Sequence, residues 1–468
     1  MGLQLVGVGP ALEKAIALHV AEKWDPGEVA VFQETTGDTE LDGLLVVGEA
    51  GRAPAEGVLV TDSLRLDPAT AQVPEVLFQV DAKLGRLTKS YLAKQATRPY
   101  MTREGAFSRR ELLLGVTKGF QRPSTLPYVF GDSCEARHGC RSCVDVCPAN
   151  ALQVSEGVVR VSDTSCTACG ICAGICPVGA IQMPELSDAS MFGLLDAVDA
   201  SDAPKKTLVI TCDDRAVERQ PWMVVEKLAS VGMVGPRFLA AAAASSLGGV
   251  AVVCPDGKCA GEERVRLAVD ALKGSLPADS SGPFVDFVGK AGGTGRLASL
   301  HEASKPRSPR PPRTGDKWKD YVADLTSVLP AGAFASGLGL TEMGVSESCT
   351  LCSACTKACP HGSLRMDDRH LFFDASTCTG CRACVSACPE HAIALSGASG
   401  KISQLMQSEQ VYEDELVVCV RCGKPIGSAK FVNKVSSVLG PDAKLVKYCP
   451  SCKKEVLMES IFGGSRRG

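Results

Sequence analysis

Helix-like and strand-like patterns of hydrophobic residues alternate along the first part of the chain. The amphipathic stretch Ala11–Lys23 has the 3.6-residue period of a helix, and short β-branched apolar runs surround it. These runs are Leu3–Val8, Val29–Phe32, Leu44–Val47 and Val58–Thr61. Runs of this length predict buried strands, and strands that alternate with a helix predict a parallel sheet. We therefore expect a small α/β domain over residues 1–125.

A second stretch of the same kind covers residues 200–304. Strands are predicted for the runs TLVIT (Thr207–Thr211), GGVAVVC (Gly248–Cys254) and PFVDFVG (Pro283–Gly289). Helices are predicted for Val217–Ser230 and Glu262–Lys273. The fold class expected from these patterns is multidomain, with two small Rossmann-like α/β domains among α+β modules.

Residues 305–319, KPRSPRPPRTGDKWK, are basic and rich in proline. This composition predicts an extended linker whose charges face solvent. It separates a first module at residues 126–190 and the middle domain from a second module at residues 320–400, and a tail follows at residues 401–468.

Composition narrows the classes of function. With 468 residues the chain needs several cores, and its 50 basic and 53 acidic residues nearly cancel. Nucleic acid and anionic membranes are therefore not expected as main partners. The longest uncharged runs, Phe238–Cys254 and Leu325–Thr341, contain Gly, Ser or Pro and fall short of a span of about 20 residues.

The chain contains 23 cysteines. The N-terminal sequence predicts a strand and a turn without a signal peptide, and the twin-arginine-like SRRELLLGV at residues 108–116 is internal with a short apolar stretch. We therefore expect a cytoplasmic protein, where a reducing environment keeps thiolates free to bind metal.

Seven cysteines repeat at a fixed offset of 212 residues. The first set is Cys140, Cys143, Cys147, Cys166, Cys169, Cys172 and Cys176, and the second is Cys352, Cys355, Cys359, Cys378, Cys381, Cys384 and Cys388. A match at all seven positions predicts two modules of the same kind.

The second module has the spacing C-x2-C-x2-C-x3-C-P twice, at Cys349, Cys352, Cys355 and Cys359 and again at Cys378, Cys381, Cys384 and Cys388. It resembles the bacterial two-cluster ferredoxin, in which the fourth cysteine of each run ligates the other [4Fe–4S] cluster. The resemblance assigns one cluster to Cys349, Cys352, Cys355 and Cys388, and its neighbour to Cys378, Cys381, Cys384 and Cys359. A small residue and an aliphatic one recur four and five positions after each cysteine that precedes a proline, and we expect these pairs to pack between the clusters and exclude water. The pairs are Ala151-Leu152, Ala180-Ile181, Ser363-Leu364 and Ala392-Ile393.

The first module departs from this spacing at its opening cysteine, because five residues separate Cys134 from Cys140. We assign one cluster to Cys134, Cys140, Cys143 and Cys176, and the other to Cys166, Cys169, Cys172 and Cys147. His138 lies in the enlarged loop and is either a replacement ligand or a surface side chain. Zinc is the alternative metal for all these cysteines, but zinc sites typically use two paired knuckles.

The tail contains such a pair of knuckles, Cys419-x2-Cys422 and Cys449-x2-Cys452, with Gly423 and Lys453 expected in turns. Four thiolates at this spacing predict a zinc ribbon with a structural role. A rubredoxin-like iron site is the alternative, although only Phe431 and Tyr448 supply aromatic rings between the pairs.

Residues 204–275 resemble the delta subunit of methyl-viologen-reducing hydrogenase, a family that carries electrons between a hydrogenase or formate dehydrogenase and heterodisulfide reductase through a [2Fe–2S] cluster. The resemblance rests on Cys212 after the first strand and on Cys254-x4-Cys259. It implies a possible [2Fe–2S] site at these three cysteines. Asp213 and Met233 stand where the family has further cysteines, so we favour a docking domain without its cluster.

The predicted function is a polyferredoxin-like electron-transfer subunit of a larger anaerobic oxidoreductase complex, and we identify no catalytic residue. Resemblance implies a hydrogenase, a formate dehydrogenase or a heterodisulfide-reductase-like flavoprotein as partners. The alternative is an oxidoreductase with its own flavin or substrate site in an α/β domain. Gly7-x-Gly9 begins a dinucleotide fingerprint, but Leu12 occupies the place of its third glycine.

Overall fold

The computed structural model describes residues 2–6, 15–18, 20–21, 30–32, 44–48, 62–65, 80, 126–183, 186–200, 205–213, 216–277, 282–289, 294–305 and 308–462. They divide into two compact units. The first contains Met1–Cys134 and Arg141–Pro330, and the second contains Glu135–Cys140 and Ala331–Gly468. No helix within the described ranges is long and apolar enough to cross a bilayer.

The described residues of the N-terminal domain form a parallel sheet, as predicted. The strands are β1 (Gly2–Val6), β2 (Ala30–Phe32), β3 (Leu44–Gly48) and β4 (Asp62–Arg65), in the order β2-β1-β3-β4. The fourth strand follows the predicted run at residues 58–61, which lies outside the described residues. Residues 15–18 and 20–21 are helical, within the predicted helix. Gly7, Gly9, Leu12 and residues 108–116 also lie outside the described part of the chain.

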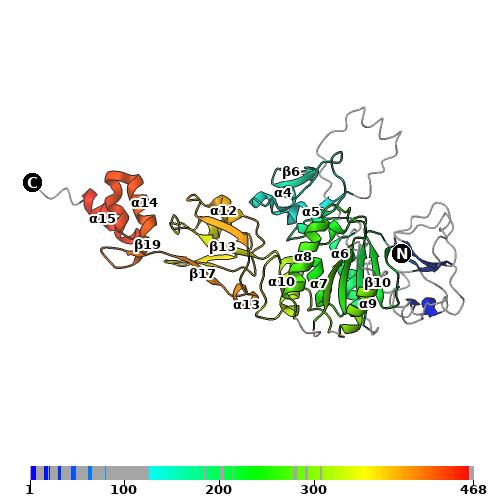
Figure 1. Ribbon diagram of the computed structural model, residues 1–468. Helices are drawn as coiled ribbons and strands as arrows, with labels where there is room; N and C mark the ends of the chain where they lie inside the picture. Colours follow the sequence, from blue (N-terminus) through cyan, green and yellow to red (C-terminus); the bar gives the residue numbers. More distant parts are fainter. Residues whose placement is uncertain are drawn as a thin grey trace, which may run out of the picture. The chain divides into compact units, whose positions relative to one another are not determined.

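A second parallel sheet forms the centre of the middle domain (Figure 1). Its strands are β9 (Thr207–Thr211), β10 (Met223–Lys227), β11 (Gly249–Val253) and β12 (Phe284–Val288), in the order β10-β9-β11-β12. The associated helices are α6 (Asp188–Asp199), α7 (Pro236–Ala244), α8 (Glu262–Ser275) and α9 (Thr294–Ala303). All residues of β9 and β11 are buried, which explains their continuous apolar sequence.

One predicted helix of this domain is wrong. The segment Val217–Ser230 contains strand β10, and the next α-helix, α7, begins only at Pro236, after the 3-10 helix η4 (Val231–Met233). Met223, Val224, Val225 and Glu226 are all buried. A parallel strand that is covered on both faces, as β10 is at the edge of this sheet, carries apolar residues on each face, so its hydrophobic period does not distinguish it from a buried helix.

The proline-rich segment at residues 305–319 is anchored to the first unit by two arginines. The Arg310 side chain is only 3% exposed and pairs with Asp196 and with Asp199, the latter at 2.7 Å. Arg313 pairs with the buried Asp324 at 2.8 Å. Asp324 lies in α10 (Lys317–Val328), whose N-terminus is capped by Asp316. Several of the segment's charges thus stabilise the fold.

The first ferredoxin-like module consists of short elements. They are β5 (Tyr128–Val129), the 3-10 helices η1 (Gly131–Ser133) and η2 (Glu135–His138), α4 (Ser142–Asp145), β6 (Leu152–Ser155), β7 (Val158–Val161), α5 (Ile171–Ile175) and β8 (Ile181–Gln182). β5 pairs with β8, and β6 pairs with β7, both antiparallel.

The second module repeats this plan. β13 (Thr341–Val345) pairs with β16 (Ile393–Gly397), and α11 (Ala354–Ala358) and α12 (Ala383–Ala387) carry the cysteine loops. A three-stranded sheet joins β14 (Leu364–Met366), β15 (His370–Phe373) and β17 (Glu409–Glu413). The short helix α13 (Ile402–Leu405) precedes β17.

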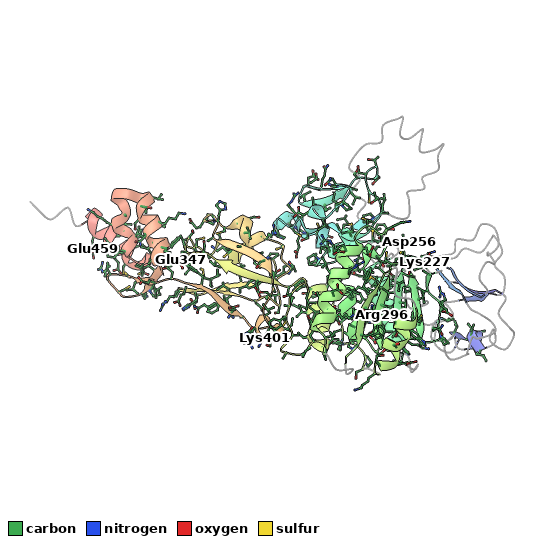
Figure 2. All side chains as sticks on the ribbon, viewed as in Figure 1. Lys227, Asp256, Arg296, Glu347, Lys401 and Glu459 are labelled. Atoms are coloured by element: carbon green, nitrogen blue, oxygen red, sulfur yellow. The ribbon has the colours of Figure 1, made fainter. Side chains whose placement is uncertain are left out.

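The tail contains one β-hairpin and two helices (Figure 1). They are β18 (Leu416–Val418), β19 (Pro425–Ser428), α14 (Ala429–Leu439) and α15 (Pro450–Phe462), with the 3-10 segment η5 (Gly440–Lys447) between the helices. Within the second unit, Ser428 donates a hydrogen bond to the carbonyl oxygen of Thr350, and Lys430 pairs with Glu347 at 2.6 Å. Glu347 is labelled in Figure 2. These contacts attach the tail to the first cysteine loop of the second module.

Candidate metal centres

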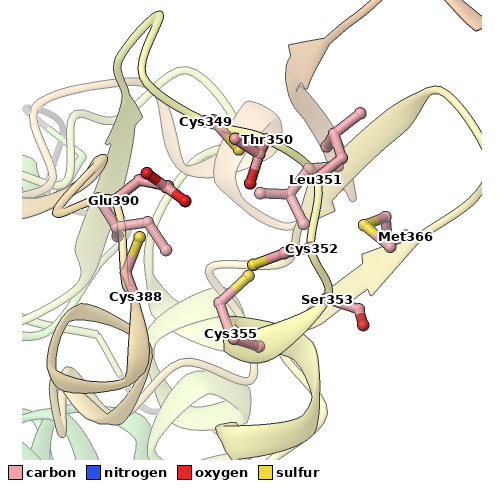
Figure 3. Close-up of a pocket in the computed structure, with 12 residues that line it drawn as sticks. Cys349, Thr350, Leu351, Cys352, Ser353, Cys355, Met366, Cys388 and Glu390 are labelled. Carbon is pink, nitrogen blue, oxygen red and sulfur yellow. The ribbon is translucent and has the colours of Figure 1, made fainter. Parts of the chain in front are cut away.

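One pocket in the second module collects four cysteines from two distant loops. Cys349 and Cys352 come from the loop before α11, Cys355 lies in the first turn of α11, and Cys388 follows α12. Figure 3 shows their sulfur atoms facing a common space that Leu351 and Met366 also border. These four cysteines are the ones predicted from the sequence to bind a single cluster.

The neighbouring cysteines form a second group through Cys359. Burial, and then the charges of Cys384, Cys381 and Cys359, raise the pKa of Cys378 to about 12, against a backbone hydrogen bond from Gly380. Burial followed by the charges of Cys381 and Cys359 raises the pKa of Cys384 to about 11. Cys359 therefore acts electrostatically on the loop that precedes α12. Thiols with such pKa values remain protonated at neutral pH unless a metal ion displaces the proton.

The first module contains a pocket that corresponds to this second group, at the offset of 212 residues. Cys147, Cys166, Cys169 and Cys172 line it together with Leu152 and Ile171. Burial and the charges of Cys143, Cys169 and Cys166 raise the pKa of Cys172 to about 12. Of the remaining predicted set, Cys134, Cys143 and Cys176 belong to the first unit and Cys140 to the second.

A backbone hydrogen bond recurs at each of the four Cys-Pro positions. In every case the amide four residues later donates to the cysteine sulfur: Ala151 to Cys147 at 3.3 Å, Ala180 to Cys176 at 3.2 Å, Ser363 to Cys359 at 3.3 Å and Ala392 to Cys388 at 3.3 Å. The donors are the small residues of the repeated small–aliphatic pairs, and both members of each pair are buried. An N–H group aimed at sulfur stabilises a thiolate and raises the reduction potential of a cluster that it ligates.

The loops between the cysteines adopt a left-handed backbone at several non-glycine residues. Leu351 has φ +52°, Ser353 φ +64°, Arg382 φ +65° and Ala168 φ +55°. Such conformations cost free energy and are found where a site constrains the chain. Here they turn the cysteine side chains of one loop toward the same side.

The enlarged loop of the first module makes a contact that no sequence motif predicts. Within the second unit, Thr379 donates a hydrogen bond to Glu135 at 2.9 Å, and His361 also bonds the Glu135 carboxylate. Glu135 is 8% exposed. The neighbouring His138 lies in the 3-10 helix η2, which gives no indication of a ligand role. A single buried glutamate has no characteristic spacing in the sequence, so its contact with the cysteine loop could not be predicted from the sequence alone.

The three cysteines of the middle domain lie together. Cys212 follows β9, Cys254 follows β11, and all three sulfur atoms, with Cys259 included, are within 4.8 Å of one another. The Cys212 and Cys254 sulfurs are 3.8 Å apart. Among the described residues, no fourth His, Cys, Asp or Glu belongs to the group.

The four cysteines of the tail also converge, with all sulfur atoms within 4.8 Å and the Cys422 and Cys449 sulfurs 3.5 Å apart. A tetrahedral ion with metal–sulfur bonds of about 2.3 Å separates its ligands by about 3.8 Å, so the group fits one ion. Burial opposes ionisation of Cys419, but backbone N–H groups of Cys449, Arg421 and Cys422 lower its pKa to about 6.

One of the two turns predicted for the tail site is present, and a helix replaces the other. Gly423, with φ +72°, lies in the turn of the β18–β19 hairpin as expected. Lys453, in contrast, lies inside α15, so Cys452 belongs to the first turn of a helix. Side-chain hydrogen bonding with Cys422, followed by burial, raises the pKa of Cys452 to about 12, against the partial positive charge of the helix N-terminus, which favours a thiolate. Tyr448 and Ile426 pack against the cysteines.

All 23 cysteines lie in the described residues and each is a free thiol. No curated protein matches the chain. The family model of the 4Fe-4S dicluster domain matches residues 134–185 and again residues 348–392. These two regions are therefore ferredoxin-like modules of an iron–sulfur protein, and their function is electron transfer.

Proposed function

We propose that the chain is a polyferredoxin-like subunit that relays low-potential electrons through four [4Fe–4S] clusters between redox partners of a larger anaerobic oxidoreductase complex. Each cluster takes three cysteines from one loop and the fourth from the other run, in the sets given above. The observation that carries this proposal is the hydrogen bond that a backbone N–H group donates to the sulfur of each of the four cysteines that precede a proline. These four cysteines are the ones assigned to the cluster of the other run, and all four have the same hydrogen bond.

The same proposal assigns one zinc ion to Cys419, Cys422, Cys449 and Cys452, in a ribbon-like site that holds the tail together. Zinc is favoured over a rubredoxin-like iron because Phe431 is 40% exposed and Tyr448 is the aromatic residue packed on the site. The cytoplasm, with its low redox potential, is the compartment in which all these thiolates stay available.

Partners are expected to dock on the middle domain, which we regard as Rossmann-like. By its resemblance, the candidates are a hydrogenase, a formate dehydrogenase or a heterodisulfide-reductase-like flavoprotein. A docking role fits the exposed face of α8, where Leu267 is 61% exposed and lies between the exposed Glu263 and Asp270. A [2Fe–2S] cluster at Cys212, Cys254 and Cys259 would instead make this domain part of the electron path.

Purification of the native protein under anaerobic conditions tests the relay. Four cubanes require about sixteen irons and sixteen sulfides per chain. A count near eight irons would leave one module empty and overturn the four-cluster proposal. Mass spectrometry of the co-purifying proteins identifies the donor and acceptor.

Docking is tested by reversing charge on α8 with the double variant Glu263→Lys and Asp270→Lys. Co-purification of the redox partner should fall while the iron content stays unchanged. Lys454→Glu, on an exposed position of the tail helix α15, is the control for a change of charge elsewhere. Undiminished co-purification of the α8 variant would place the interface on another surface.

The competing function, an oxidoreductase with its own flavin or substrate site, predicts a bound flavin. A flavin released by acid denaturation and detected by fluorescence would favour it over the relay.

A further inference from the structure

The sheet topology brings the Cys212 and Cys254 thiols to one edge of the middle domain. β9 and β11 are parallel neighbours, and their paired register ends at Thr211 opposite Val253. Cys212 and Cys254 are each the next residue, so they leave the sheet side by side at its carboxyl edge. Lys227 ends β10, and Asp256 lies in the loop after β11, at the same edge (Figure 2).

This edge position is the topological switch point of the sheet. In the order β10-β9-β11-β12, the chain passes from β9 to one side and later returns to the other side at β11. The connection after β9 therefore runs toward one side of the sheet and the connection after β11 toward the other, at the ends of the two strands that carry the thiols. Open α/β sheets bind their ligands in the crevice at this point, outside the carboxyl ends of the strands.

A tight turn returns Cys259 to the same place. Pro255, Asp256 and Gly257 follow Cys254, and Gly257 has φ +61°, as a Pro-Asp-Gly turn requires. Burial raises the pKa of Cys254, against a hydrogen bond that its sulfur accepts from the backbone N–H of Cys259. Cys254 itself is fully buried, whereas Cys212 and Cys259 are partly exposed. The group thus has a buried floor and an open side.

The far end of this loop is fixed against the first module. A Cβ atom at Gly232 would lie 2.3 Å from the carbonyl oxygen of Ala260 and 3.0 Å from that of Cys169. At Gly261, φ is +84° and a Cβ would lie 2.6 Å from Ile171. Gly232 therefore permits a close backbone contact, and Gly261 permits close approach of the Ile171 side chain, on the segment that follows Cys259.

We propose that Cys212, Cys254 and Cys259 bind one thiophilic divalent ion of the zinc class, with the fourth coordination position open. The sulfur separation of 3.8 Å between Cys212 and Cys254 equals the edge of a tetrahedral thiolate site, about 3.8 Å for bonds of about 2.3 Å. Binding breaks three S–H bonds, forms three metal–sulfur bonds and releases three protons to solvent. Three protein ligands with a free position are the arrangement of zinc sites that take an exogenous ligand. The site is distinct from the four clusters and does not depend on the relay.

The test uses the full chain with its clusters, equilibrated with ZnCl2 and then desalted anaerobically. The Cys452→Ser background removes the tail ion, and Cys259→Ser is the added variant because that position is partly exposed. We expect the background protein to retain one zinc per chain and the double variant to lose it, with the iron content equal in both. Zinc-edge X-ray absorption of the background protein should show three sulfur ligands and one oxygen or nitrogen ligand.

Thiol labelling supplies a readout that does not depend on metal counting. In the Cys452→Ser background, zinc should protect Cys212 and Cys259 from iodoacetamide, and a chelator should expose them. Cys212→Ser provides a second variant with the same expected loss of zinc. Equal zinc content in the background protein and in both added variants would overturn the proposal. So would two extra irons and two extra sulfides per chain that depend on Cys259, because they would show a [2Fe–2S] cluster.

Discussion

The backbone of Gly235 passes so close to Gly174 that a Cβ atom at residue 235 would lie 1.8 Å from the Gly174 carbonyl oxygen. Gly235 caps the N-terminus of α7 in the middle domain, and Gly174 lies in α5 between two cysteines of the first module. The contact joins the middle domain to a cluster loop inside the first unit.

Gly235→Ala should therefore destabilise the first unit, because the added methyl group cannot be accommodated against backbone atoms. Overpacking of this kind costs about 1–3 kcal/mol. Denaturant unfolding followed by circular dichroism measures the loss. Gly274→Ala is the matched control: a Cβ there meets no atom within 4 Å, and alanine is the better helix former in α8. Equal stability of the two variants would show that the contact is not rigid.

A pH-dependent contribution to stability is expected from His301. Its ring stacks on Trp222 with centroids 4.3 Å apart, and its Nδ1 is hydrogen-bonded to Thr207 Oγ1 at 2.9 Å. Burial, followed by the charges of Lys205 and Lys206, lowers the pKa of His301 from 6.5 to about 4. The folded state thus binds the proton less readily than the unfolded chain. The contribution is fully present above about pH 6.5 and is lost as the pH falls toward 4.

His301→Gln keeps a hydrogen-bonding side chain but cannot titrate. We expect the difference in melting temperature between wild type and this variant to be largest near pH 7 and to shrink as the pH falls to 5. A difference that is constant with pH would mean that His301 has the same pKa in the folded and unfolded states.

If the fourth cysteine of each run ligates the cluster of the other run, the Cys359→Ala variant should expose a defined set of thiols. Iodoacetamide should label Cys378, Cys381 and Cys384 in this variant, because their cluster loses its fourth ligand. Cys349, Cys352 and Cys355 should stay protected. Peptide mass spectrometry after labelling gives the answer.

Cys388→Ala is the reciprocal control and should expose the Cys349, Cys352 and Cys355 set instead. Labelling of the cysteines nearest in sequence to each substitution would reject the exchanged assignment.

The tail should lose one zinc equivalent on Cys419→Ser, with the iron content unchanged, because three thiolates hold a structural zinc much more weakly than four. Elemental analysis and the helical signal of α14 and α15 report the loss. Ser451→Ala, at an exposed position beside Cys452, should leave the zinc content intact. Iron in place of zinc, with a rubredoxin-like absorbance, would contradict this prediction.

Much of the candidate chemistry was accessible from the sequence, because it is local. The sevenfold repeat identified two modules of the same kind, and the family model of the 4Fe-4S dicluster domain matches both. The small residue four positions after each cysteine that precedes a proline was also recognisable in the sequence. Only the structure shows that its backbone N–H group donates a hydrogen bond to the sulfur of that cysteine.

Tertiary structure decided the features that depend on contacts between distant residues. Strand β10 replaces a predicted helix because burial on both faces removes the alternation that marks a strand. Arg310 anchors the proline-rich segment through Asp196 and Asp199, which are more than 100 residues away. Cysteine spacing within one loop fixes which thiols face one metal, so the sequence by itself determined the cluster motifs. The gathering of Cys212 and Cys254 depends on the pairing of β9 with β11, and no local spacing encodes that register.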